Sequence, residues 1–368
     1  MHDATLVTTR DQLETAVFRM QGATRLALDT EFMRERTYHA RLCLVQIATD
    51  ADCFLIDTCA GLELGALHAL LADRARVKIL HAARQDLETL FVASGRVPGP
   101  VFDTQVAAAL LGFPPQVGYA ELVARQLGHS IDKGQTRTDW SRRPLTPEQL
   151  AYAADDVHHL LALHAELAAA LEGQGRAGWL VEDARALEDE SLYRLDPADA
   201  WRRLKGLMRL RPPEQAAARA LAEWRERRAV ASDKPRGWIL SDEALYGLAT
   251  RAPSTLGELE QVPALPPALV RKRGEELISL VASARERSAE AAAPQVPPRP
   301  TPEETAQLAR LQQHVRNKAA ELGISPEVLA TRRDVEALVF RGRGESVLVR
   351  GWRRDVIGRE LLELSSAT

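Results

Sequence analysis

The clear strand-like patterns of this 368-residue chain all lie between residues 25 and 81, which limits the architectures open to it. Residues 25–32, 42–48, 53–57 and 77–81 are short apolar runs of strand length, and Asp50-Ala51-Asp52 marks a turn between two of them. From Gly61 onward the leucines follow helical spacing, so helices alternate with the last strand. These patterns predict an α/β first domain with a mixed sheet.

The remaining patterns are helical. The first domain continues with predicted helices at 104–111, 119–127, 147–158 and on to residue 172, followed by a helical connection through 179–193. Residues 208–285 have almost no β-branched alternation, and 213–228 has helical periodicity with a proline at its start. Beyond a proline-rich stretch, 303–322 has the pattern of a long helix and 326–330 that of a short one.

These patterns divide the chain into three predicted domains. We expect an α/β domain at residues 1–195, with its helical connection from about residue 173, and two small all-α domains at 208–287 and 303–368. Residues 288–302 contain five prolines and are predicted to form an extended linker. Both helical regions begin with a long helix and continue with short ones, so a weak internal repeat is expected.

Composition excludes several classes of protein. The contents of 45% hydrophobic and 27% charged residues are those of an ordinary globular protein. The apolar runs are far shorter than the roughly 20 residues of a membrane span, and the N-terminus has no secretory pattern. Cys43, Cys53 and Cys59 indicate neither a disulfide framework nor a structural zinc site. We therefore expect a cytoplasmic protein without membrane association.

Charge is divided unevenly along the chain. Residues 1–195 carry 19 lysine and arginine residues against 27 acidic ones, a formal charge of −8. Residues 196–368 carry 29 against 24, a charge of +5. The split indicates either an acidic working domain followed by basic modules that bind a partner, or two unrelated solvated surfaces.

Three acidic motifs carry the chemistry. Asp29 and Glu31 end an apolar strand, and residues two apart on a strand project to the same face, where a divalent cation such as Mg²⁺ or Mn²⁺ is the usual compensation. Asp86 lies in the first turn of a helix that follows a strand. Tyr152 and Asp156 share a helix face, because they are four residues apart. Each motif alone is typical of an acidic turn, helix start or helix face, but the three together indicate a metal site.

Further motifs accompany these acids. They are Thr37-Tyr38, Phe102-Asp103-Thr104-Gln105, Asp132-Lys133, Arg137-Thr-Asp-Trp140 and Arg143-Pro-Leu145, and downstream Leu221-Ala-Glu-Trp-Arg225, Asp233-Lys-Pro235, Ile239-Leu-Ser-Asp-Glu243 and Thr255-Leu-Gly-Glu-Leu259. With them, the whole first domain resembles the ribonuclease D family of the DEDD exonuclease superfamily, in the subgroup with tyrosine in its third motif. The downstream motifs resemble the helicase-and-RNase-D C-terminal (HRDC) domain. The family carries two such modules, and the final region fits the second.

The resemblance implies a ribonuclease H-like α/β domain and metal-dependent 3′-to-5′ exoribonuclease activity. Such an enzyme would trim tRNA precursors and other small stable RNAs by two-metal phosphodiester hydrolysis and release nucleoside 5′-monophosphates. By the same resemblance, Asp29, Glu31, Asp86 and Asp156 hold two Mg²⁺ or Mn²⁺ ions, Asp29 bridges both, and Tyr152 orients the attacking water. Zinc is not expected, because His158 and His159 have no partners at zinc spacing.

An exonuclease also needs a groove for a single-stranded 3′ end, with side chains that stack on bases and cations that meet phosphates. Candidate residues are Phe32, Met33, Tyr38 and Trp140 for stacking, and Lys133, Arg137 and Arg143 for phosphates. A basic cluster before a helix is also often solvated surface. His81 is interpreted as a hydrogen-bonded histidine at a strand end rather than a substrate contact.

The expected partner is therefore RNA with a single-stranded 3′ end, a tRNA precursor above all, and the protein is expected to be a monomer. Two alternatives are a DNA-directed exonuclease, which a 2′-hydroxyl requirement would separate, and a nuclease-like scaffold that binds nucleic acid without cleaving it. The four intact acids and the tyrosine speak against the scaffold.

Overall fold

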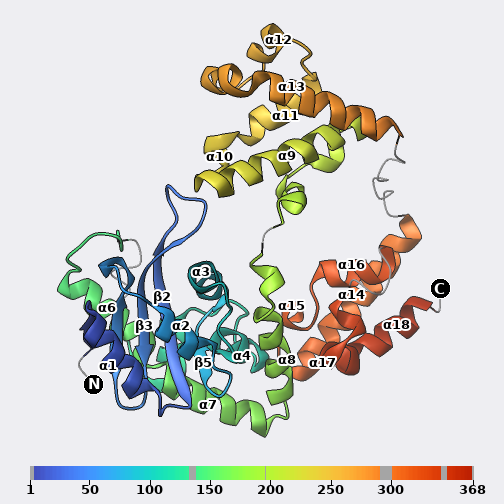
Figure 1. Ribbon diagram of the computed structural model, residues 1–368. Helices are drawn as coiled ribbons and strands as arrows, with labels where there is room; N and C mark the ends of the chain where they lie inside the picture. Colours follow the sequence, from blue (N-terminus) through green and yellow to red (C-terminus); the bar gives the residue numbers. More distant parts are fainter. Residues whose placement is uncertain (1–3, 132–137, 195, 291–300, 341–345, 367–368) are drawn as a thin grey trace. The chain divides into compact units, whose positions relative to one another are not determined.

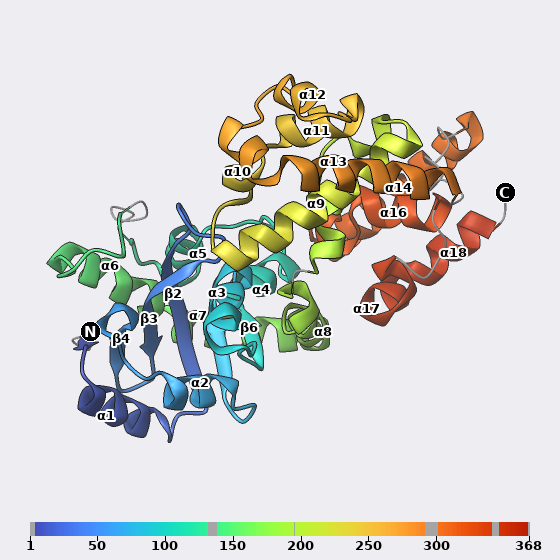
Figure 2. The ribbon, with the colours of Figure 1, turned by 45° about the horizontal axis from the view of Figure 1, so that its top comes forward.

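The computed structural model describes residues 4–131, 138–194, 196–290, 301–340 and 346–366, with only the backbone of residues 289, 290 and 340. The chain divides into two compact units (Figures 1 and 2). The first joins Met1–Met33, Leu42–Glu190 and Pro300–Thr368, and the second joins Arg34–Arg41 to Ser191–Arg299. Each unit is therefore assembled from segments that are far apart in sequence.

A six-stranded sheet forms the centre of the first unit, in the order β1-β4-β3-β2-β5-β6. Its strands are β1 (Thr5–Val7), β2 (Arg25–Met33), β3 (Arg41–Ala48), β4 (Cys53–Asp57), β5 (Val77–Leu80) and β6 (Val101–Asp103). β1 pairs with β4, and β5 with both β2 and β6, in parallel, whereas β3 and β4 are antiparallel. The predicted mixed sheet is confirmed. The sequence patterns had missed β1 and β6, which have three residues each.

Helices cover this sheet. They are α1 (Arg10–Met20), α2 (Gly65–Ala72), α3 (Arg84–Ser94), α4 (Thr104–Leu110), α5 (Tyr119–Leu127), α6 (Pro147–His158), α7 (Leu160–Gly173) and α8 (Ala177–Leu187). α6 and α7 both pack against β2, and α1 packs against α2 (Figure 1). α6 begins where the sequence predicts, because Thr146 and Gln149 form a capping box around Pro147. α1 was not predicted, although Thr9 and Gln12 cap it in the same way.

The C-terminal module is part of the first unit. It contains α14 (Pro302–Leu322), α15 (Pro326–Leu329), α16 (Arg332–Phe340), α17 (Gly351–Arg353) and α18 (Arg359–Ser366). Trp352 stacks on Trp179 of α8 with ring centroids 4.3 Å apart, and Arg353 pairs with Asp183 at 2.5 Å. Buried side chains of both regions form one hydrophobic core. Residues 303–368 were predicted as a separate domain, but here they share the core of the α/β region.

The second unit is helical, as predicted. It contains α9 (Pro212–Ser232), α10 (Arg236–Ile239), α11 (Asp242–Arg251), α12 (Leu256–Glu260) and α13 (Pro267–Glu290), around a core of its own that includes Leu221, Leu245, Leu248 and Leu277. α13 reaches Glu290 and α14 begins at Pro302, so both ends of the predicted linker at 288–302 are helical, and residues 291–300 lie outside the described ranges. Within those ranges, no helix is long and apolar enough to cross a membrane.

Candidate active site

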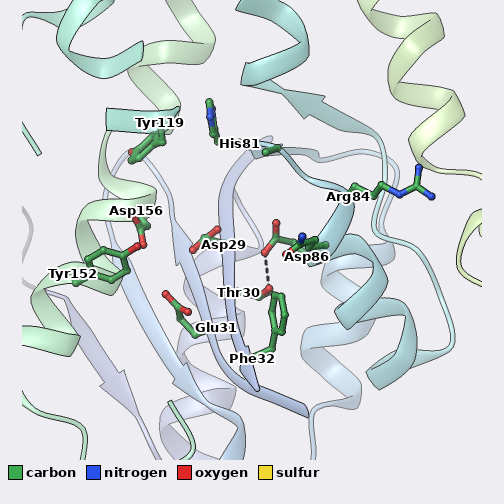
Figure 3. A pocket seen from close by; sticks show the side chains of 12 residues that line it. Asp29, Thr30, Glu31, Phe32, His81, Arg84, Asp86, Tyr119, Tyr152 and Asp156 are labelled. Carbon is green, nitrogen blue, oxygen red and sulfur yellow. Dashed lines mark hydrogen bonds between the residues drawn. The ribbon is translucent and has the colours of Figure 1, made fainter. Parts of the chain in front are cut away.

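The three acidic motifs meet in one pocket of about 470 Å³ in the first unit (Figure 3). β2 contributes Asp29 and Glu31 from one face of the strand, and α6 contributes Asp156. One carboxylate oxygen from each of these three residues lies within 4.8 Å of the others. Asp86, in the first turn of α3, lines the same pocket but stands outside this group of three. The sequence-predicted acids are thus brought together.

Asp86 is held in place by its neighbours. The Thr30 hydroxyl, between Asp29 and Glu31 on β2, donates a hydrogen bond of 2.6 Å to the Asp86 carboxylate (Figure 3). The turn that leads into α3 is fixed by Asp103 at the end of β6, whose carboxylate accepts from the backbone N–H groups of Ala82 and Ala83 at 3.1 and 2.8 Å. Ala82 has a φ of +55°, a conformation that costs a non-glycine residue about 1 kcal/mol. These contacts fix the position from which Asp86 enters the pocket.

The carboxyl groups of the pocket hold their protons more tightly than free acids. Burial raises the pKa of Glu31 to about 9, and repulsion from Asp156 and Asp86 adds to the rise. Burial also raises the pKa of Asp29 well above its usual value, with further repulsion from the other three acids. The pKa of Asp86 and that of Asp156 are both raised to about 7, mainly by burial. A nearby cation would favour the ionised forms, so the site is suited to positive charge.

Tyrosine side chains complete the wall beside Asp156. Tyr152 lies one turn before Asp156 on α6, and its hydroxyl hydrogen-bonds to the Asp156 carboxylate. The two side chains lie next to each other in Figure 3. The Tyr119 hydroxyl donates to the Asp155 carbonyl at 3.1 Å and accepts from the His159 backbone at 3.3 Å. The Tyr152 hydroxyl is thus directed at the group of acids, whereas that of Tyr119 ties α5 to the end of α6.

His81 also lines the pocket, with both ring nitrogens engaged. Nδ1 lies 2.9 Å from the Thr104 hydroxyl and Nε2 lies 3.0 Å from the Val117 carbonyl oxygen. Burial lowers its pKa. His81 is therefore hydrogen-bonded at the end of β5, as interpreted from the sequence.

The predicted substrate-binding residues are not gathered in this pocket. Phe32 lines it, whereas Met33 packs against the hydrophobic core and Tyr38 belongs to the second unit. Lys133 and Arg137 lie outside the described residues. Within the first unit, Phe32 is thus the predicted stacking residue that lines the pocket.

Trp140 and Arg143 support α6 instead of facing the pocket. Trp140 is only 2% exposed, and its ring centroid lies 6.1 Å from that of Tyr152, so no free face is left for a base. Arg143 pairs with Asp57 at 2.5 Å and donates to the Cys43 carbonyl at 2.9 Å. Both side chains hold the segment before α6 against the sheet.

Sequence reasoning did not single out five residues that line the pocket, namely Thr30, Ala82, Arg84, Gln85 and Tyr119. Arg84 and Gln85 immediately precede Asp86 at the start of α3, and this proximity was a usable signal. The Arg84 side chain extends along the rim, away from the carboxylates (Figure 3). Tyr119 gave no signal of its own, since it reaches the site through the packing of α5.

The donor set fits a hard divalent cation. The three clustered ligand atoms and the fourth acid are all carboxylate oxygens, which Mg²⁺ and Mn²⁺ prefer, whereas zinc sites use cysteine and histidine. Asp155, next to Asp156, lines a different pocket with His158 and His159 and takes no part in this group. The arrangement is chemically suited to metal-assisted hydrolysis of a phosphodiester.

Comparisons with known proteins agree with this geometry. Residues 4–172 match the family model of 3′-5′ exonucleases, and residues 214–281 match that of the HRDC domain. The ribonuclease D of Gluconacetobacter diazotrophicus is 38% identical over 98% of this chain and 93% of its own length. That of Pseudomonas paraeruginosa is 39% identical over 92% and 91%.

A solved structure shows the same likeness. The crystal structure of Escherichia coli RNase D, described as an exoribonuclease involved in structured RNA processing, aligns with a TM-score of 0.90 at 31% identity and covers 99% of both chains. These similarities extend over the α/β region and the helical modules alike, and they favour the exoribonuclease over the DNA-directed and non-cleaving alternatives. The chain therefore belongs to the ribonuclease D family of 3′-to-5′ exoribonucleases.

Proposed function

We propose that this exoribonuclease trims the 3′ ends of tRNA precursors and other small stable RNAs by two-metal-ion hydrolysis, releasing nucleoside 5′-monophosphates. The observation that carries the proposal is the convergence of Asp29, Glu31 and Asp156 within 4.8 Å, with Asp86 in the same pocket. The likeness to a relative described as acting in structured RNA processing supports the choice of substrate.

The four carboxylates would hold two Mg²⁺ or Mn²⁺ ions, which supply a more acidic bound water and stabilise negative charge on the leaving oxygen. Tyr152 has a different task. Its hydroxyl, which hydrogen-bonds to the Asp156 carboxylate, orients the attacking water beside that acid. Phe32, which lines the pocket, offers a stacking surface to the terminal base.

The test is digestion of a 5′-labelled tRNA that carries a short 3′ extension, with Mg²⁺, with Mn²⁺ and with excess chelator. We expect a stepwise ladder from the 3′ end that requires metal, is abolished in Asp29→Ala and falls by about 10²-fold or more in Tyr152→Phe. Asp155→Ala is the matched control, because its carboxylate faces a different pocket. Chromatography of the products should show nucleoside 5′-monophosphates.

Two outcomes would overturn parts of the proposal. A ladder that persists in chelator, or in Asp29→Ala, would contradict the metal mechanism. Degradation of an unstructured RNA together with an untouched tRNA extension would leave the exoribonuclease in place and remove tRNA precursors as its substrate. A matched DNA strand serves as the control for the 2′-hydroxyl requirement.

Arg84 provides a separate test of how RNA enters the site. It is the cation among the described lining residues, so we expect its guanidinium to meet a backbone phosphate. Arg84→Ala should raise KM roughly tenfold with little change in kcat, since one charge-assisted hydrogen bond is lost. Arg84→Lys keeps the charge and should recover part of the loss. A fall in kcat at unchanged KM would contradict this role.

A further inference from the structure

The connection between β2 and β3 belongs to the second unit. Residues Arg34–Arg41 cluster with Ser191–Arg299, which include the HRDC match at 214–281. At the tip of the connection, the backbone N–H groups of Tyr38 and His39 both donate to one carboxylate oxygen of Asp233, at 3.0 and 3.1 Å. One side chain of the helical module thus fixes two consecutive peptide groups of the connection.

A second anchor lies beside the first. The Tyr38 hydroxyl donates a hydrogen bond to Glu226 on α9. The Glu226 side chain is only 1% exposed and is also paired with Arg203 at 2.9 Å and with Arg236 at 3.8 Å. Tyr38 therefore places its polar end against a buried carboxylate that two arginines also contact.

The backbone of Asp233 gives an independent indication. Asp233 ends α9 in the left-handed conformation, at φ +47° and ψ +48°, where glycine is the favoured residue. A residue kept in a costly conformation points to a constraint imposed by its surroundings. Here the constraint is visible, because glycine would relax the backbone but would leave the N–H groups of Tyr38 and His39 without their acceptor.

Both strands that enter this connection serve the active site. β2 carries Asp29 and Glu31 and ends at Met33, directly before the connection. β3 carries Gln46, whose amide lies 3.5 Å from the Asp29 carboxylate. Residues 34–40 therefore run from the end of β2 to the start of β3, and within them Tyr38 and His39 are bound to the helical module.

We propose that Asp233 and Tyr38 are positioning residues for catalysis. By holding the connection in one conformation, the HRDC-containing unit fixes β2 so that Asp29 and Glu31 keep their places in the pocket. This effect rests on the role proposed above for those two acids. The proposal predicts that the helical module contributes to turnover even of an RNA that is too short to contact the module while its 3′ end lies in the pocket.

The test compares Asp233→Gly with Asp233→Asn in the full-length protein. Glycine accepts the left-handed backbone but removes the acceptor, whereas asparagine tolerates the same backbone and keeps an acceptor oxygen. On a short single-stranded RNA, Asp233→Gly should lower kcat about ten- to hundredfold, as expected for slightly misplaced catalytic groups, with KM nearly unchanged. Asp233→Asn should recover most of the loss. Tyr38→Phe, which keeps the ring, should lower kcat to a smaller degree.

Hydrogen exchange gives a readout that does not depend on activity. The amides of 29–33 and 41–46 should exchange faster in Asp233→Gly than in the wild type, and at the wild-type rate in Asp233→Asn. Arg36→Ala, at an exposed position of the same connection, is the matched control and should leave this exchange unchanged.

Two results would overturn the inference. One is an Asp233→Gly protein that keeps the wild-type kcat on the short RNA and changes only KM for tRNA-length RNA, because the module would then act by gripping RNA. The other is unchanged exchange in both Asp233→Gly and Tyr38→Phe. Failure of the proposed function is distinct from either, because it would show in the wild type as hydrolysis without metal.

Discussion

Carboxylates with little contact to solvent occur in two places in this chain, half-buried in the pocket and fully buried at Glu226, and their charge is compensated in different ways. In the first unit, Asp29, Glu31 and Asp156 converge within 4.8 Å, and in the described ranges no lysine or arginine forms an ion pair with them. In the second unit, the Glu226 side chain is only 1% exposed, is paired with Arg203 and Arg236 and accepts from Tyr38. In the pocket, carboxylates lie next to one another without a basic partner, whereas the Glu226 carboxylate is contacted by two arginines of the chain.

This difference separates a site for a ligand from a structural junction. A buried carboxylate costs several kcal/mol unless opposite charge or hydrogen bonds compensate it. Around Glu226 the compensation is built into the chain, so the group holds the helical module and the β2–β3 connection together. In the pocket a bound cation would supply the compensation for the ionised acids. The uncompensated carboxylates of the pocket therefore lower the stability of the metal-free fold.

The sharpest way to test this contrast is Asp29→Asn. Activity should fall by about 10³-fold or more, because a ligand to the catalytic cations is lost. At pH 9 in chelator, the free energy of unfolding should instead rise by about 1–2 kcal/mol, because one of several repelling charges is removed. Denaturant unfolding with chelator and RNA digestion with Mg²⁺ measure the two effects. A less stable metal-free variant would contradict the uncompensated charge.

Glu226→Ala should have the opposite effect on stability. The substitution leaves Arg203 and Arg236 without their partner and removes the acceptor of Tyr38, so the free energy of unfolding should fall by about 2–3 kcal/mol. Glu223→Ala, in the exposed pair with Arg227 on the same helix, is the control and should change stability by less than about 0.5 kcal/mol. If the two substitutions changed the free energy of unfolding equally, Glu226 would not stabilise the fold through its contacts with Arg203, Arg236 and Tyr38.

The pocket also predicts how the stability of the metal-free protein depends on pH. The pKa of Asp86 and that of Asp156 are raised to about 7 and the pKa of Glu31 to about 9, so the folded state binds protons more tightly than the unfolded chain. This contribution is complete below the usual acid pKa of about 4 and is lost as pH rises through about 7 to 9.

Thermal unfolding across that range, in chelator and with excess Mg²⁺, measures the contribution. The midpoint should fall with rising pH in chelator, and Mg²⁺ should reduce the fall, because the cation binds the ionised acids. A midpoint that rises from about pH 6 to about pH 9 in chelator would contradict the raised pKa values.

Much of the fold follows from local patterns in the sequence. β2 and β4 are apolar runs with clear ends, and α6 has its capping residues and proline in place, so these elements were predicted within a residue or two. β1 and β6 are three residues long, too short for a period to show, and they form because neighbouring strands pair with them. The inclusion of residues 303–368 in the first unit depends on tertiary contacts such as Trp179 with Trp352.

In the candidate site, too, some residues could be predicted from local sequence patterns and others could not. The four acids were found because each sits at a position that its element fixes, such as the end of β2 or the first turn of α3. Residue type alone does not say which side chains are free to contact a substrate. Trp140 and Arg143 are of residue types that bind RNA, but the Trp140 ring is buried and the Arg143 guanidinium is paired with the Asp57 carboxylate. Tyr38 looked like a stacking residue, whereas its hydroxyl meets Glu226.

The titration of Tyr38 is the smallest of these expected effects, and it reports specifically on the contact between Tyr38 and Glu226. Burial and the hydrogen bond to Glu226 raise its pKa to about 12, so the neutral phenol stabilises the fold up to its usual pKa near 10, and this contribution is lost as pH rises through about 12. Glu226→Gln should lower the pKa of Tyr38 toward 10, because Arg203 and Arg236 then face the phenolate without a competing carboxylate.

Rapid-mixing absorbance of the phenolate isolates this one group, since Tyr38→Phe, subtracted from the wild type, removes one of five tyrosines. A Tyr38 that titrates near its usual pKa in both the wild type and Glu226→Gln would show that the hydroxyl is free in solution. That result would take away one of the two anchors of the β2–β3 connection and leave Asp233 alone to hold it.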